Sequence, residues 1–113
     1  MPAFGLPDKT VAIVRQILAD FPAVEKAVIY GSRAKGNYKP GSDIDLTLYG
    51  TALDQRLLML IASALDDSDI PYTVDLSLFE QIENSALRAH IERAGKVFYE
   101  RGDAGEYQGC RAG

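Results

Sequence analysis

The chain has 113 residues, 47% hydrophobic and 25% charged, which is the composition of a single globular domain with a modest core. Its formal net charge of −4 disfavours bulk nucleic-acid binding, since a protein held mainly by phosphate contacts carries a basic surface. One cysteine and one histidine exclude an internal disulfide and a zinc site, and the sequence has no signal pattern or membrane-length apolar run, so we expect a cytoplasmic protein.

Apolar residues spaced three and four positions apart predict the helices of the chain. We expect them at 8–21, 53–65 and 85–94, with a further helix of a turn or two beginning near Ser32. Asn84 or Ser85 is placed to cap the last of these helices, and Gly95 to end it. From residue 101 the chain is polar and rich in glycine, so we expect one folded domain over 1–100 and a disordered tail over 101–113.

Strands are predicted between the helices, at 27–30, 43–49, 72–78 and 96–99. The segment 43–49 alternates, with apolar residues on one side and Asp43 and Asp45 on the other; the segment 72–78 alternates in the same way and carries Asp75. Strands that alternate with helices predict an α/β fold, a small mixed β-sheet with helices packed on one face. If the two acidic strands are neighbours, the three carboxylates converge on the exposed face.

The acidic face is a candidate metal site. Three neighbouring carboxylates repel one another, and divalent cations relieve that repulsion. Mg²⁺ prefers hard oxygen ligands and bridges carboxylates to substrate phosphates. Two such ions about 4 Å apart would brace the attacking and leaving oxygens of a displacement at phosphorus. Asp43, Asp45 and Asp75 are therefore our candidate metal ligands and catalytic residues, with two Mg²⁺ ions as the expected cofactor.

A candidate phosphate-binding loop lies directly before the first acidic strand. Gly31 permits a sharp turn and a close approach of the triphosphate, and the amides that follow, with the Ser32 hydroxyl, can hold phosphate oxygens. Arg33 and Lys35 can offset the charge of the triphosphate. Two further residues, Gly36 and Ser42, complete the set that we expect to bind the nucleotide.

The order of these residues resembles the DNA polymerase beta superfamily of nucleotidyltransferases. The pattern is Gly31-Ser32-x-x-x-Gly36, a five-residue loop, Ser42-Asp43-x-Asp45-Leu46, and then Asp75 on a later strand. The resemblance covers residues from about 10 to about 100, and the short chain is similar to the minimal nucleotidyltransferase (MNT) branch. It implies that Gly31 and Ser32 bind the triphosphate, that Asp43 and Asp45 bind both metals, and that Asp75 binds the catalytic metal near the acceptor hydroxyl.

The resemblance also implies a reaction and a partner. Members of the MNT branch are often paired with a helical HEPN protein, and in some pairs the small enzyme is an antitoxin that adenylylates its partner. The expected activity is an Mg²⁺-dependent transfer of AMP from ATP to an acceptor hydroxyl on such a partner. The alternative is a non-catalytic binding module that neutralises a partner sterically. The three carboxylates argue against it, because a module without chemistry need not keep charges that repel one another.

Overall fold

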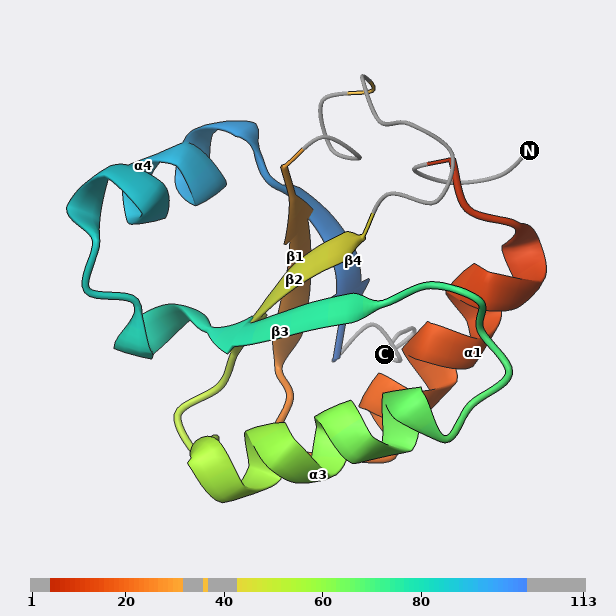
Figure 1. Ribbon diagram of the computed structural model, residues 1–113. Coiled ribbons are helices and arrows are strands. Elements are labelled where there is room, and N and C mark those ends of the chain that lie inside the picture. Colours follow the sequence, from red (N-terminus) through yellow and green to blue (C-terminus); the bar gives the residue numbers. More distant parts are fainter. Residues whose placement is uncertain (1–4, 32–35, 37–42, 102–113) are drawn as a thin grey trace, which may run out of the picture.

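The computed structural model describes residues 5–31, 36 and 43–101. Along the chain it contains α1 (Asp8–Ala19), β1 (Lys26–Tyr30), β2 (Ile44–Tyr49), α3 (Gln55–Asp66), β3 (Val74–Leu78), the short 3-10 helix η1 (Phe79–Gln81), α4 (Ser85–Ala94) and β4 (Lys96–Glu100) (Figure 1). The helices and strands predicted within the described residues are confirmed, with ends that differ by a residue or two. The short helix expected near Ser32 lies outside these residues, as does the tail expected over 101–113 except for Arg101.

Side-chain caps explain where two of the helices begin. Asp54 accepts a hydrogen bond from the amide of Leu57 at 2.9 Å and starts α3. Asn84 accepts one from the amide of Leu87 at 3.1 Å and starts α4, as the sequence predicted. Each cap satisfies a backbone N–H that has no partner within its own helix. None of the described helices has both the length and the apolar character needed to cross a membrane.

The four strands form one mixed sheet in the order β3-β2-β1-β4. β1 runs antiparallel to both of its neighbours, β2 and β4, whereas β2 and β3 are parallel. Parallel neighbours need a crossover connection, and α3 lies in the connection between β2 and β3. The predicted fold class, a small mixed β-sheet packed with helices, is therefore confirmed.

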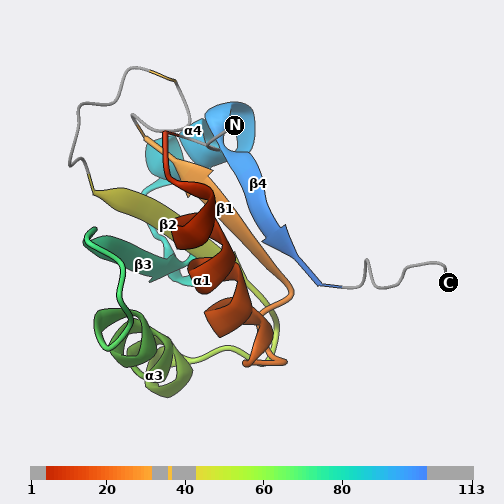
Figure 2. The same ribbon diagram turned by 90° about the vertical axis from the view of Figure 1, so that its right-hand side faces the viewer.

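The main core lies between one face of the sheet and the helices α1 and α3, which contact each other on that face (Figure 2). Its residues are fully buried, for example Leu18 of α1, Leu46 of β2 and Ile61 of α3. The apolar sides of β2 and β3 point into this core. Their polar sides, which carry the aspartates, consequently point to the opposite face.

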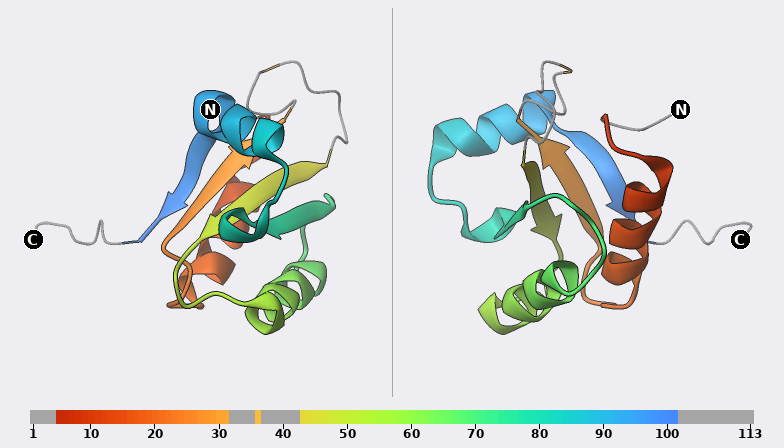
Figure 3. Two further views of the ribbon diagram at one scale, coloured as in Figure 1. Left: turned by 90° about the vertical axis from the view of Figure 1, so that its left-hand side faces the viewer. Right: turned by 45° about the vertical axis from the view of Figure 1, so that its right-hand side comes forward.

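The third helix departs from the predicted arrangement, because α4 covers part of the opposite face together with η1 (Figure 3). Here Val28 of β1, Phe79 of η1 and Ile91 of α4 form a second buried cluster. The physical reason is visible in β1, where Ala27, Val28 and Ile29 are all buried instead of alternating. A strand that is apolar on both faces needs cover on both.

A series of stacked side chains holds α4 and η1 against the sheet. The Tyr49 and Phe79 rings stack with centroids 4.5 Å apart, and the Arg88 guanidinium lies 4.4 Å from the centroid of Phe79. Lys26 Nζ lies 4.5 Å from the centroid of the Tyr49 ring. Arg88 also donates to the backbone oxygens of Phe79 and Ile82 at 3.0 and 3.1 Å. Arg88 therefore ties α4 to η1 through both its charge and its hydrogen bonds.

Removing this tie is expected to destabilise the fold. Arg88→Gln should lower the free energy of unfolding by about 1–2 kcal/mol, because a cation–π contact and two backbone hydrogen bonds are lost. The matched control is Arg93→Gln, which removes an exposed arginine from the same helix and should change stability by less than about 0.5 kcal/mol. Urea unfolding of the two variants measures the difference. Equal stability of both would contradict the role given to Arg88.

Candidate functional site

The acidic residues lie where three strands run side by side. Parallel pairing places Asp45 of β2 opposite Asp75 of β3, and antiparallel pairing places Tyr30 of β1 opposite Asp45. Residues at paired positions point to the same face of a sheet, so these three form one row across the strands. Asp75 is exposed and Asp45 is partly buried. Asp43, the third carboxylate of the sequence pattern, is exposed and lies one residue before β2.

The charges of this row act on one another. Burial raises the pKa of Asp45 above its ordinary value, and the neighbouring charges of Asp75 and Asp43 raise it further. Within the described residues, however, no three His, Cys, Asp or Glu side chains lie close enough together to hold one metal ion. The structure thus brings Asp45 and Asp75 together as a pair, with Asp43 within electrostatic reach of Asp45.

The donors of this pair suit a Mg²⁺ ion. Mg²⁺ is usually held by one or two carboxylates, and its remaining ligands are water and substrate phosphates. Asp45 and Asp75 offer hard oxygen ligands in that number, and Asp43 lies within electrostatic reach of Asp45. A cation bound there would also offset the like charges that raise the pKa of Asp45.

Gly31 is fitted closely to the acidic pair. Its φ is +79°, a backbone conformation that favours glycine, so the sharp turn predicted at this residue is confirmed. A Cβ atom built on Gly31 would lie 2.7 Å from Asp45 Oδ2, closer than real Cβ contacts come. Gly36 also has a positive φ, +85°, but a Cβ there would meet nothing within 4 Å. The other predicted nucleotide-binding residues, Ser32, Arg33, Lys35 and Ser42, lie outside the described part of the chain.

The sequence analysis did not include two hydroxyl groups on this face, those of Tyr30 and Ser77. Burial raises the pKa of Tyr30, a smaller effect of hydrogen bonding to Ser77 lowers it, and the charges of Asp45 and Asp75 raise it further. Ser77 lies on β3, two residues after Asp75, and therefore on the same face. Tyr30 directly precedes Gly31, and Ser77 continues the polar alternation of Asp75. The alternation of the strands could therefore have placed both hydroxyl groups on the face that carries the aspartates.

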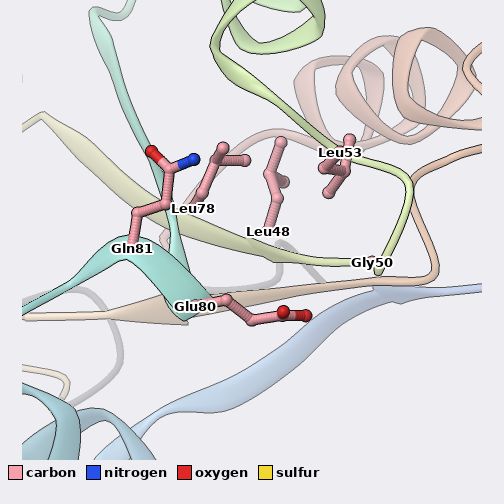
Figure 4. A pocket seen from close by; sticks show the side chains of 6 residues that line it. All are labelled: Leu48, Gly50, Leu53, Leu78, Glu80 and Gln81. Atoms are coloured by element: carbon pink, nitrogen blue, oxygen red, sulfur yellow. The ribbon is translucent and has the colours of Figure 1, made fainter.

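A hollow of about 240 Å³ lies at the other end of β2, away from the aspartates (Figure 4). The residues that line it are Leu48, Gly50, Leu53, Leu78, Glu80 and Gln81. None of these residues belongs to the acidic row. The chemistry of the site therefore rests on the exposed strand ends and not on this hollow.

Fold and site together define a class of protein. The mixed sheet presents paired aspartates on adjacent strands, beside a glycine turn. The family model described as polymerase beta, nucleotidyltransferase, matches residues 13–104, so the chain belongs to this family. The resemblance seen in the sequence is thereby confirmed. The comparison with curated proteins gave no match.

Solved structures share the fold. A chain of a toxin–antitoxin complex with AMP-PNP is 24% identical, with a TM-score of 0.60 over 83% of this chain and 76% of that one. A putative nucleotidyltransferase from Sulfolobus solfataricus is 25% identical, with a TM-score of 0.53 over 82% and 79%. A chain of the complex of a tri-AMPylated Shewanella oneidensis HEPN toxin with its MNT antitoxin is 22% identical, with a TM-score of 0.55 over 81% and 71%.

Proposed function

We propose that the protein is an Mg²⁺-dependent nucleotidyltransferase that transfers AMP from ATP to a hydroxyl group of a HEPN-type partner protein. One observation carries the proposal: Asp45 and Asp75 stand at paired positions of adjacent strands, and the backbone at Gly31 lies against the Asp45 carboxylate. The proposed metal ligands thus lie beside the glycine turn at which the proposed phosphate loop begins. A transfer reaction at a triphosphate needs that juxtaposition.

The two aspartates have different surroundings, which suggests different tasks. Asp45 is partly buried on the inner strand β2 and is suited to hold metal. Asp75 is exposed on the edge strand β3, where an acceptor hydroxyl can reach it. In the proposed reaction the acceptor oxygen bonds to the α-phosphorus, the bond to the bridging oxygen breaks, and pyrophosphate leaves. The carboxylate of Asp75 takes the proton of the acceptor, while bound Mg²⁺ would supply charge stabilisation.

A partner protein as acceptor is supported by solved structures that share this fold. The Shewanella oneidensis complex of the same fold contains an AMPylated HEPN toxin, and another complex contains AMP-PNP. The steric alternative predicts binding of the partner without any transfer.

The test is transfer of label from ATP. With Mg²⁺ and a HEPN-type protein encoded beside this chain, label in the α-phosphate should appear on the HEPN protein, whereas label in the γ-phosphate should leave with pyrophosphate. Asp75→Asn should abolish transfer, because an amide is a poor metal ligand and a poor proton acceptor. Without a partner we expect only slow self-modification.

Two results would contradict the proposal. Rapid turnover onto a free small molecule would rule out a protein acceptor. Neutralisation of the partner without label, equally by the wild type and by Asp75→Asn, would establish the steric alternative.

A further inference from the structure

The two edges of the sheet differ in how their backbone groups are occupied. β4 forms one edge and β3 the other (Figure 2). At β4, Arg15 of α1 donates from Nε to the backbone oxygen of Phe98 at 2.8 Å, and its guanidinium lies 5.3 Å from the centroid of the Phe98 ring. The register of β4 on β1 also shifts between Ala27 and Val28. A charged side chain and an irregular register both hinder the pairing of a further strand with an edge.

The edge at β3 is open along its backbone. The Ile44 amide donates to the Thr73 oxygen at 2.9 Å, which fixes the pattern of the parallel pairing. Alternate residues of a strand direct their N–H and C=O groups to opposite sides, so Asp75 bonds to β2 while Val74 and Leu76 direct theirs outward. Among the described residues these outward groups have no hydrogen-bond partner, and both side chains are partly exposed. β3 can therefore accept another strand.

The open edge is the one that carries Asp75, the proposed proton acceptor. A residue paired with Asp75 on an added strand would point to the same face as its carboxylate. Because Asp75 directs its own backbone groups to β2, this would be a non-hydrogen-bonded pair, in which antiparallel Cα atoms are only about 4.5 Å apart and side chains are closest. A hydroxyl side chain at this position would lie beside the Asp75 carboxylate.

We propose that the acceptor protein binds by strand addition to β3, with a serine, threonine or tyrosine of an extended segment opposite Asp75. In this mode of recognition backbone hydrogen bonds, here to Val74 and Leu76, supply affinity, and alternate side chains supply specificity. The residues on either side of the hydroxyl would lie opposite Val74 and Leu76, so the preferred segment has a hydroxyl residue between two apolar ones. This inference rests on the proposed function and specifies how its substrate is presented.

Hydrogen exchange of single amides, measured by NMR, tests the docking directly. The complex is formed with the HEPN-type protein encoded beside this chain, Mg²⁺ and an ATP analogue whose α,β-bridge is a methylene group, so that no transfer occurs. Val74 and Leu76 should exchange fast in the protein alone. In the complex their exchange should slow at least about tenfold, because each N–H gains a partner. Asp75 and Ser77 are the control within the same strand, since their amides already bond to β2 and should change little.

A substitution at Val74 tests the backbone contact separately. Proline is tolerated at the first residue of an edge strand when the N–H that it removes faces solvent, so Val74→Pro should fold, which circular dichroism checks. The KM for the acceptor protein should rise about fivefold, as expected for one lost hydrogen bond, with kcat and ATP affinity nearly unchanged. Val74→Ala is the matched control, because it shortens the side chain but keeps the N–H. Its KM should stay within about twofold of the wild type.

The outcomes separate this inference from the proposed function. If the wild type transfers AMP but Val74 and Leu76 gain no protection, or if Val74→Pro and Val74→Ala have equal KM values, strand addition is wrong and the proposed function stands. Protection that appears in the protein alone as its concentration rises would mean that a second copy pairs with this edge, which also overturns the inference. Protection in the complex without any transfer from ATP would keep the docking site and overturn the proposed function. If the wild type neither binds nor modifies the HEPN-type protein, both fall.

Discussion

Asp45→Asn is expected to lower AMP transfer by about a thousandfold, because an amide replaces a carboxylate that would hold Mg²⁺ and metal binding supplies several kcal/mol of charge stabilisation. The residue is partly buried, at the centre of the row formed with Tyr30 and Asp75. Asparagine has nearly the same shape, so the fold should be retained. Transfer of labelled AMP, measured alongside circular dichroism, checks both statements.

The same substitution should raise the stability of the metal-free protein. Burial, Asp75 and Asp43 raise the pKa of Asp45, so the folded protein holds this proton more tightly than the unfolded chain does. The stability that this group contributes is present at low pH and is lost as the pH rises through the folded-state pKa. At neutral pH the ionised carboxylate therefore opposes folding. Its removal should add about 0.5 kcal/mol, a small value because solvent screens much of the charge.

Two conditions sharpen this result. Below the ordinary carboxyl pKa of about 4 the gain should vanish, since Asp45 is then protonated in both states. Stabilisation of the protein by added Mg²⁺ and ATP should also vanish in Asp45→Asn, because ligands stabilise only a state that binds them. Asp69 is exposed, and Asp69→Asn is the control. This substitution should change neither the stability of the metal-free protein nor its stabilisation by Mg²⁺ and ATP. A lower melting temperature of metal-free Asp45→Asn, with full ligand stabilisation, would show that Asp45 is structural.

Gly31→Ala is expected to weaken metal and ATP binding about a hundredfold, because the added methyl group would displace the Asp45 carboxylate from beside the backbone. The new Cβ would lie 2.7 Å from Asp45 Oδ2, and the φ of +79° adds a conformational penalty. Gly36→Ala separates the two effects, since Gly36 has a φ of +85° and open space around it. Its stability should fall only by about 1 kcal/mol, the conformational part alone.

Calorimetry with Mg²⁺ and ATP, together with urea unfolding, measures the contrast. Gly31→Ala should lose more stability than Gly36→Ala, and its affinity for the metal should fall much further. If both variants bind metal with the same affinity, the close approach of Gly31 to Asp45 does not contribute to metal binding. Gly31 is then needed only for the conformation of the turn.

Features that depend on neighbours along the chain were predictable from the sequence. The helix at 85–94 was predicted with its observed bounds, and Asn84 was one of the two caps expected for it, because helical spacing, capping and termination are local properties. The two-residue alternation of β2 and β3 likewise separated the aspartates from the apolar core, because alternate side chains of a strand point to opposite faces. The order of glycine and aspartate residues led to the family.

Long-range packing decided the rest. No local pattern states that β2 and β3 are parallel neighbours, or that their register sets Asp45 against Asp75 instead of one residue away. No local pattern predicts that α4 packs on the face of the sheet opposite the main core. That placement follows from the apolar residues on both sides of β1. Tyr30 and Ser77 lie on the same face as Asp45 and Asp75 only once the three strands are assembled. The sequence by itself thus determined which strand faces carry the aspartates, where the glycine turn lies and where the helices are capped. The tertiary structure decided which of these residues lie next to one another, because strand register and helix placement arise from contacts between distant segments.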